Sequence, residues 1–335
     1  MVKKKLIKRS YYFRNKKEKI KPLKIIKYIY QIILIFILLL MYFFIYIYKI
    51  KKEEEKYYTK ERRTIFKKYN ESNIITFNDK INWILIHDTN KLKGKCADKI
   101  LLHDYAKKKI GKDICNKILK IYNNEEEIDL NQLPQQFILK TNHGSGYNII
   151  VEDKNSLNFD EAKKQLKEWL KIDYGKIACE FHYSFIKKKI FAEEYIGKEL
   201  KNYKFLCYDG KPKYVYLSRT ENGTKYRNFY DMNWTFINFV CLSQPHPTYK
   251  YEKPKFFELM KEYAKKLASD FKFVRVDLYE LENEVRLGEL TFSPMNTFFS
   301  CRNRQNEIDL GKDIDTKERL YDFFIYFLGK IGYYG

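Results

Sequence analysis

A lysine followed by a small, polar loop is the first feature of this sequence that could do chemistry. Residues 137–146 read FILKTNHGSG, in which an apolar strand pattern ends at Lys140 and leads into Gly144 and Gly146. Glycines allow backbone N–H groups to approach phosphate oxygens, although the Walker A pattern is absent. An ordinary hairpin turn is the alternative, but the loop is longer than the two residues that hairpins prefer. With almost no apolar anchor, this loop is expected to be mobile.

Two further lysines stand in comparable positions. Lys99 opens a predicted helix directly after Asp98, and Lys204 lies within a predicted strand. Three lysines on separate elements could converge on one polyphosphate, because each supplies a positive charge to phosphate oxygens.

Two carboxylates lie in the segment RVDLYELENEVRLGELTF. Asp277 is early on one predicted strand, and Glu289 follows twelve residues later on the next. In an antiparallel pair these side chains can be neighbours, and they would repel each other unless a cation lay between them. Magnesium bound to ATP fits, since it accepts one or two protein carboxylates and otherwise takes phosphate oxygens and water. Two surface acids are the alternative, although apolar neighbours argue against solvent exposure.

The elements that must position these residues are mixed helices and antiparallel strands, which predicts an α+β fold. Apolar side chains at helical spacing predict helices within residues 96–113, 158–173 and 254–271. Gly111 ends the first of these, and Asn158 begins the second as an N-cap. Alternating patterns predict strands within residues 136–140, 148–153, 189–196, 202–210, 212–220, 273–283 and 284–292.

The charge and hydropathy of the N-terminal region indicate a membrane protein. Lys and Arg total 65 against 43 Asp and Glu, and residues 1–27 hold twelve of the basic residues with one acid. Concentration of the charge in a tail argues against a nucleic-acid partner. Residues 28–48 then contain no charge, and tyrosines occur at both ends. This length and pattern predict one transmembrane helix in contact with lipid, rather than a signal peptide or an interfacial helix.

The six cysteines are widely separated and form no CxxC pair, and the five histidines show no metal-binding spacing. The pattern therefore predicts buried, reduced thiols and no zinc site.

Four motifs in order resemble a known family. LPQQFILKTNHGSGYNIIVED, FAEEYIGKELKNYKFLCYDGKPKYVY, NFYDMNW and RVDLYELENEVRLGELTF are similar to motifs of the TupA-like ATP-grasp family. Its members are associated with the synthesis of teichuronopeptide and other cell-surface polysaccharides. The resemblance covers roughly residues 75–300. It implies an ATP-grasp fold, in which two α+β subdomains grip ATP, preceded here by the transmembrane helix. The expected organisation is a basic tail at 1–27, the helix at 28–48, a charged linker at 49–75, the catalytic domain at 76–302 and a C-terminal helical segment at 303–335.

The resemblance also implies roles for individual residues. Lys99 and Lys140 would bind the α- and β-phosphates of ATP. The loop 141–148 would close over the triphosphate with His143, Gly144, Ser145 and Gly146. The adenine would be bound by Glu193, Glu194 and Ile196, and the ribose by Glu199. Arg275 and Lys204 would be catalytic, Arg275 by stabilising charge on the transferring group. Asp277 and Glu289 would hold Mg²⁺.

Three positions depart from the family pattern. Asn202 stands where an aspartate is expected, and Thr291 stands where many ATP-grasp enzymes have an asparagine, with Asn296 the nearest substitute. The family usually continues with Pro-Gly-Gly after GELTF, whereas this chain reads SPMNTFF, which alters the turn on the substrate side.

The implied reaction is ATP-dependent joining of a carboxylate to an amine through an acyl phosphate, with envelope polysaccharide precursors as the expected substrates. A membrane-anchored glycosyltransferase is one alternative, because Asp313 and Asp315 form a DxD sequence, although an N-terminal helix cap also explains them. A non-catalytic scaffold with a decayed ATP site is another.

Two considerations give opposite predictions for the orientation of the chain in the membrane. The twelve basic residues before the span outnumber the seven in residues 49–63, which favours a cytoplasmic N-terminus and an external catalytic domain. The need for ATP favours the opposite, and we expect a cytoplasmic catalytic domain.

Overall fold

The computed structural model describes residues 28–43, 45, 74–87, 90, 92–178, 180–197, 200–297, 299 and 301–316. The chain divides into two units, Met1–Thr59 and Lys60–Gly335. The predicted tail at 1–27, residues 49–73 of the predicted linker and the predicted helical segment from 317 onward lie outside the described residues.

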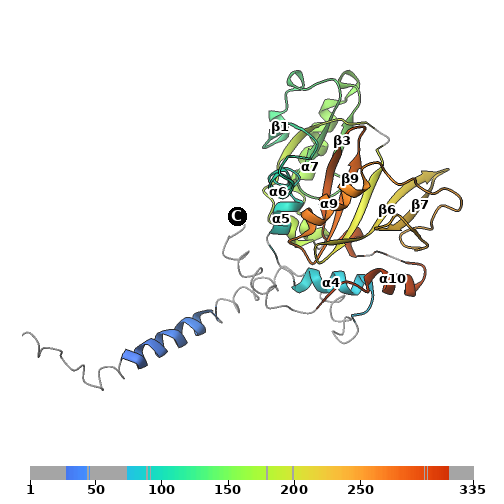
Figure 1. Ribbon diagram of the computed structural model, residues 1–335. Helices are drawn as coiled ribbons and strands as arrows, with labels where there is room; N and C mark the ends of the chain where they lie inside the picture. The colour runs from blue at the N-terminus through green and yellow to red at the C-terminus, as the bar shows by residue number, and fades with distance from the viewer. Residues whose placement is uncertain are drawn as a thin grey trace, which may run out of the picture. The chain divides into compact units, whose positions relative to one another are not determined.

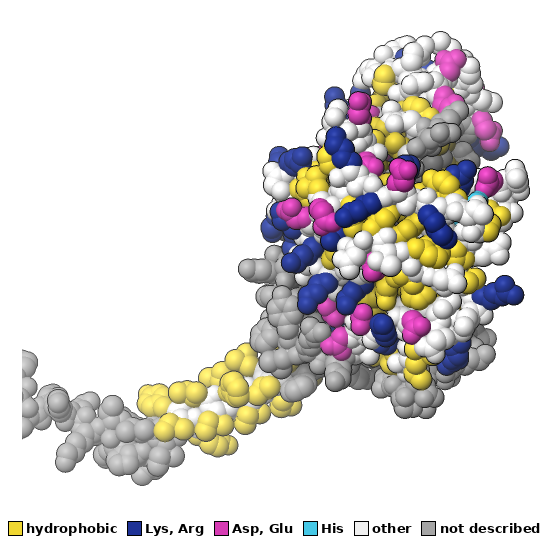
Figure 2. Space-filling view, turned by 45° about the vertical axis from the view of Figure 1, so that its right-hand side comes forward, with side chains coloured by type: hydrophobic (Ala, Val, Ile, Leu, Met, Phe, Trp, Pro, Cys, Tyr) yellow, Lys and Arg dark blue, Asp and Glu magenta, His cyan; other side chains and the backbone are white. Residues whose placement is uncertain are grey.

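In the first unit, residues 28–43 form a helix with exposed apolar side chains. Hydrophobic side chains cover its visible surface in Figure 2. Within the part of the chain that the structure describes, no helix combines the length and the apolar character needed to cross a membrane. Residues 44 and 46–48 of the predicted span lie outside that part.

The second unit contains helices and antiparallel strands (Figure 1). The α-helices are α4 (Phe77–His87), α5 (Leu92–Ala97), α6 (Leu102–Ile110), α7 (Phe159–Lys171), α8 (Tyr174–Ile177), α9 (Phe257–Ala268) and α10 (Arg304–Gly311). The strands are β1 (Ile118–Tyr122), β2 (Phe137–Thr141), β3 (Asn148–Val151), β4 (Ile190–Glu194), β5 (Asn202–Tyr208), β6 (Lys211–Glu221), β7 (Thr224–Asp231), β8 (Phe236–Ile237), β9 (Phe273–Glu280) and β10 (Val285–Thr291). Short 3-10 helices lie at Glu125–Glu127, Leu130–Gln132, Lys154–Ser156, Phe181–Tyr183 and Pro294–Thr297.

The strands form two antiparallel sheets. The large sheet has six strands in the order β10-β9-β5-β6-β7-β8, and the small sheet has four in the order β1-β4-β2-β3. The predicted α+β class and the predicted hairpin of the last two strands are confirmed.

Three apolar clusters hold these layers together. One face of the large sheet packs against α5, α6 and α9, and α9 buries the side chains predicted to face inward, such as Phe257, Met260 and Leu267. Part of the opposite face packs against α4 and α10, which also contact each other. The small sheet packs one face against α7, through residues such as Leu139 and Leu166. Each sheet therefore has one face, or part of one, left for polar side chains.

Two helix ends follow the sequence prediction. Gly111 ends α6 with a left-handed φ of 92°, and the Asn158 side chain caps α7 by accepting a hydrogen bond from the Glu161 N–H. The start of the first predicted helix was wrong. Asp98 to Leu101 form a turn, because the Asp98 carboxylate accepts hydrogen bonds from the two N–H groups that follow Lys99.

The prediction of reduced thiols was wrong for two cysteines. Cys241 and Cys301 form a disulfide across 60 residues of sequence, where an isolated antiparallel bridge makes them neighbours. Spacing along the chain contained no sign of this tertiary contact. The free thiols of Cys96, Cys115 and Cys207 are buried, as predicted.

Candidate active site

The polar end of the large sheet brings together the two predicted carboxylates and the predicted catalytic cations. In the strand register, Asp277 on β9 lies between Lys204 on β5 and Glu289 on β10, and Arg275 lies opposite Thr291. Directly opposite residues of an antiparallel pair share a face. The predicted neighbourhood of Asp277 and Glu289 is therefore confirmed.

A β-bulge places Glu289 on this face. With strict alternation along β10, Glu289 would point the same way as Leu287, into the core. The register instead shifts between Leu287 and Glu289, which leaves Gly288 as the additional residue and sets Glu289 opposite Asp277. Leu287 and Leu290 both lie in the core, which is consistent with the change of face between them.

Arg275 joins the two carboxylates. Its Nε and one terminal nitrogen donate to the two Asp277 oxygens at 2.6 and 2.9 Å, and it also forms an ion pair with Glu289. Arg275 and Asp277 are 8% and 1% exposed, so this is a buried ionic group. Burial alone would lower the pKa of Arg275, but the charges of Asp277 and Glu289 raise it well above its usual value.

Lys204 completes the cluster by forming an ion pair with Asp277. Desolvation would raise the pKa of Glu289, but the positive charges of Arg275, Lys204 and Lys99 outweigh it and hold the pKa at about 2. Thr291 also donates a hydrogen bond to Glu289 at 2.9 Å. Glu289 can therefore accept a divalent cation at neutral pH without first losing a proton.

The small sheet contributes a second charged pair. Lys140 on β2 forms an ion pair with Glu193 on β4, and the register places both on the face opposite α7. Glu193 is 8% exposed, so its carboxylate depends on Lys140 for compensation.

The glycine loop connects β2 and β3, which are antiparallel neighbours, so it is a hairpin connection whatever else it does. The expectation that few anchors hold it was wrong for its first half, because Thr141, Asn142 and His143 are at most 1% exposed. The Asn142 amide donates to Asp98 at 2.9 Å and accepts from the Lys189 N–H at 2.7 Å. Only the tip, Ser145 and Gly146, is exposed.

His143 anchors the loop rather than offering charge to a phosphate. Its Nε2 donates to the Trp169 carbonyl at 3.2 Å, which leaves Nδ1 without a proton and, within the described residues, without a partner. Burial and the positive charge of Lys188 lower its pKa to about 4. The side chain is therefore neutral at pH 7, contrary to a charged phosphate contact, and the loop backbone remains the candidate. Gly144 and Gly146 have φ values of 76° and 79°, which glycine adopts readily.

Lys99 connects the loop to both sheets. Its Nζ donates to the Gly144 carbonyl at 2.7 Å. Burial lowers the pKa of Lys99 to about 8. The positive charge of Lys140 adds to this lowering, and the negative charge of Glu289 opposes it. Charged residues of the two sheets thus act on one amine. Convergence of the three lysines on a polyphosphate stays a prediction.

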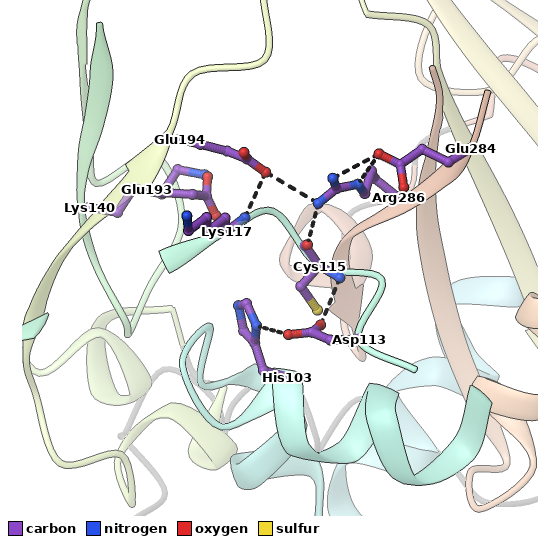
Figure 3. Close-up of polar contacts among 9 residues, drawn as sticks. All are labelled: His103, Asp113, Cys115, Lys117, Lys140, Glu193, Glu194, Glu284 and Arg286. Carbon is purple, nitrogen blue, oxygen red and sulfur yellow. Dashed lines mark hydrogen bonds and ion pairs between the residues drawn. The ribbon is translucent and has the colours of Figure 1, made fainter. Parts of the chain in front are cut away.

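A linker between α6 and β1 holds the two sheets together (Figure 3). The Leu287 N–H of the large sheet donates to the Ile114 carbonyl at 2.7 Å, and Arg286 donates to the Cys115 carbonyl at 2.8 Å. Arg286 also reaches Glu194 of the small sheet at 3.2 Å.

The predicted adenine and ribose contacts are only partly accessible. The Glu194 N–H donates to the Lys117 carbonyl at 2.9 Å, so this group is not available to adenine, and only its carbonyl remains a candidate. Ile196 is half-buried beyond the end of β4. Glu199 lies outside the described residues.

Sequence reasoning missed two cations beside this site. Arg227 and Lys225 on β7 share the face of Lys204 through the register of β5, β6 and β7. Burial lowers the pKa of both, and the neighbouring positive charges of Arg275 and Lys204, respectively, lower it further. Neither forms an ion pair with a described residue. Only the β6–β7 register places an arginine without an ion pair beside the predicted reaction centre, and the sequence alone does not give that register.

The site fits a triphosphate and a magnesium ion by its own chemistry. Four cations, Lys99, Lys140, Lys204 and Arg275, match the charge of the phosphates, and Glu289, with 41% of its side chain exposed, is an accessible metal ligand. The Asn202 Oδ1, next to Tyr279 on the same face, is buried and lacks a partner among the described residues, so the site includes an acceptor with unused capacity.

Comparison with solved structures finds proteins that resemble parts of this chain. D-Alanine-D-alanine ligase from Helicobacter pylori is 18% identical with a TM-score of 0.39, covering 67% of this chain and 60% of that one. The ATP complex of D-alanine-D-alanine ligase from Bacillus anthracis is 15% identical with a TM-score of 0.41, covering 72% and 68%. An ADP complex of N5-carboxyaminoimidazole ribonucleotide synthetase is 15% identical with a TM-score of 0.42, covering 66% and 51%. These scores are too low to carry an argument about activity, and no curated protein matches the chain.

The sequence profile of one family, described as TupA-like ATPgrasp, matches residues 79–315, which is well over half of the chain and includes every element of both sheets. The resemblance inferred from four motifs is confirmed by this match. The chain belongs to the TupA-like ATP-grasp family.

Proposed function

We propose that this protein is an ATP-dependent carboxylate-amine ligase that acts on precursors of envelope polysaccharide or teichuronopeptide. The observation that carries the proposal is the meeting of Lys99, Lys140, Lys204 and Arg275 with Asp277 and Glu289 at one place, in a chain of this family. Such a site needs no covalent nucleophile, because phosphoryl transfer depends on positioning and neutralised charge.

The residues of the chain have separate tasks in this proposal. Lys99 and Lys140 bind the phosphates from the small-sheet side, and the loop backbone at Gly144 to Gly146 closes over them. Asp277 and Glu289 would hold Mg²⁺, which would neutralise charge on the phosphate oxygens. Arg275, already fixed by two carboxylates, stabilises the charge that develops as the γ-phosphoryl group passes to the substrate carboxylate. Attack by an amine on the resulting acyl phosphate forms the amide and releases phosphate.

The substrate we propose is acidic. Arg227 and Lys225 extend the positive face beyond Lys204 without an ion pair to any described residue, so they are available to a carboxylate. Acidic sugars or an acidic peptide from the cell envelope have this chemistry.

A nucleotide panel tests the proposal on the full-length protein. Isothermal titration should show binding of ATP with Mg²⁺ and no preference for UDP- or GDP-sugars, and ADP should form only when carboxylate and amine are both supplied. Arg275→Ala should abolish turnover. Arg219→Ala, on the opposite face of the large sheet, is the matched control and should retain it. A preference for a nucleotide sugar would support a glycosyltransferase, and no nucleotide binding would support a scaffold.

We also infer that residues 28–48 anchor the chain in a membrane with the ligase domain in the cytoplasm. The support is an uncharged run of 21 residues and the need for ATP. The full chain should stay with membranes through an alkaline carbonate wash, and protease should cleave the domain only after the cells are permeabilised. Recovery of the full chain in the wash would exclude the anchor, and cleavage in intact cells would exclude this orientation.

A further inference from the structure

Three metal-ligating side chains meet outside the ATP site, beside the linker that joins the sheets. His103 comes from α6, and Asp113 and Cys115 come from the linker (Figure 3). One donor atom from each residue lies within 4.8 Å of the others. None of the three has a task in the proposed ligase reaction.

The local fold holds this trio in place. Gly111 ends α6 in a left-handed conformation and turns the chain, so that Asp113 lies beside His103 near the start of the same helix. The Asp113 carboxylate accepts from the Cys115 N–H at 3.0 Å and contacts His103 Nδ1 at 2.8 Å. Cys115 is fixed by an isolated bridge to Leu287. Three side chains fixed by backbone contacts need little rearrangement to bind an ion.

The donor atoms are those that zinc prefers. One imidazole nitrogen, one thiolate sulfur and one carboxylate oxygen form a mixed set that suits Zn²⁺, whereas Mg²⁺ requires oxygen ligands. Zinc bond lengths of about 2.0–2.3 Å place tetrahedral ligand atoms roughly 3.3–3.8 Å apart. The donor atoms of these three residues lie within 4.8 Å of one another, so binding an ion would draw them closer together. We propose that His103, Asp113 and Cys115 bind a zinc ion.

The surroundings allow an ion to enter and to stay. Side-chain exposure is 45% for Asp113 and 16% for His103, whereas Cys115 is 7% exposed. The ion therefore enters from the Asp113 side and replaces the His103–Asp113 hydrogen bond. Burial raises the pKa of the Cys115 thiol, so binding displaces its proton. Water takes the fourth position.

Sequence spacing contained no indication of this site, because His-x9-Asp-x-Cys matches no familiar zinc motif. Its position suggests a task in the molecule. The bound ion would fix Cys115, whose carbonyl accepts from Arg286, and would thereby restrain the linker that contacts both sheets.

Cobalt spectroscopy on the tag-free, reduced full-length protein tests the site directly. Co²⁺ should bind one per chain with a thiolate-to-cobalt charge-transfer absorption, and Zn²⁺ should displace it. Cys115→Ser should remove this absorption, and His103→Ala and Asp113→Asn should each weaken Zn²⁺ binding at least roughly 100-fold, because even outer-shell changes cost about 10–100-fold. Cys207→Ser, which removes a buried free thiol on β5, is the matched control and should bind normally.

Two results would overturn the proposal. One is the absence of a charge-transfer absorption in the wild-type protein, which needs no variant and so does not depend on how the variants fold. The other is an unchanged absorption in Cys115→Ser, which would place the thiolate elsewhere. Neither readout requires ATP or turnover, so the zinc site and the ligase proposal stand or fall separately.

Discussion

The two sheets present charge to the same site in different ways. In the large sheet, Arg275 is held by Asp277 and Glu289, and the three come from adjacent strands that pair along their length except at the Gly288 bulge. In the small sheet, one ion pair, Lys140 with Glu193, stands beside a loop with an exposed tip. The large sheet is therefore assembled before a ligand arrives, whereas the small sheet has a part that can still adjust. Preorganised charge serves the chemical step, and an adjustable loop serves binding and release.

The largest expected effect tests the preorganised side. Arg275→Lys keeps the charge but loses the two-point contact with Asp277, and we expect kcat to fall about 100- to 1000-fold with little change in ATP affinity. Arg275→Ala also leaves Glu289 without its ion-pair partner and Asp277 with Lys204 alone, and should lower the free energy of unfolding by about 3–5 kcal/mol. Steady-state kinetics and urea unfolding measure these effects. Equal losses in ATP affinity and kcat would remove the distinction between the sheets.

The second effect tests the adjustable side. Lys140→Met should weaken ATP binding by about 1–3 kcal/mol, the value of a charge-assisted contact, and should affect kcat less. It also leaves Glu193 unpaired, so some stability is lost as well. The double variant Lys140→Met/Glu193→Gln should recover that stability without recovering ATP affinity, as measured by titration and thermal unfolding. Recovery of both would show that Lys140 only compensates Glu193.

The third effect is a pH dependence that involves both sheets. The folded pKa of Lys99, about 8, lies below its usual value of 10.5, so its charge is present below pH 8 and is lost as the pH rises above it. Affinity for ATP with saturating Mg²⁺ should therefore fall above pH 8, approaching about tenfold per pH unit. Lys99→Arg keeps its charge and should give a flat profile from pH 7 to pH 9. A flat wild-type profile would remove Lys99 from the phosphate site.

The smallest effect concerns the altered turn after β10. Met295 has a left-handed φ of 56° in the turn where the family resemblance implies a Pro-Gly-Gly stretch, and the residue is 53% exposed. The backbone thus keeps a conformation that glycine would favour. A left-handed φ costs a non-glycine residue about 1–2 kcal/mol. Glycine avoids this cost, but it loses more conformational freedom on folding, which cancels part of the gain. Met295→Gly should therefore stabilise the protein by up to about 1 kcal/mol in urea unfolding. Destabilisation would indicate that Met295 makes a contact of its own.

Local patterns predicted the elements, and long-range contacts account for what they missed. Helical spacing located α9, and alternation located β9 and β10, because burial of one face leaves a periodic trace in the sequence. The proximity of Asp277 and Glu289 followed from a short turn. The network around Arg275 was not predictable, since it depends on which strands are adjacent.

Other features have no periodic signal at all. The Cys241–Cys301 disulfide, the linker at Cys115 and the anchoring of the loop by Asn142 each join segments far apart in sequence. The place of Arg227 on the face of Lys204 likewise depends on the register of three strands.

The bulge at Gly288 separates the spacing of two residues along β10 from the faces that they take. Leu287 and Glu289 pair with Leu278 and Asp277, which are consecutive on β9, so they take opposite faces although they are two residues apart. Deleting Gly288 would restore strict alternation and would still leave Glu289 opposite Asp277. A lineage could therefore lose this codon with the carboxylate still on its face, and a search for the motif with its glycine would pass over such a member.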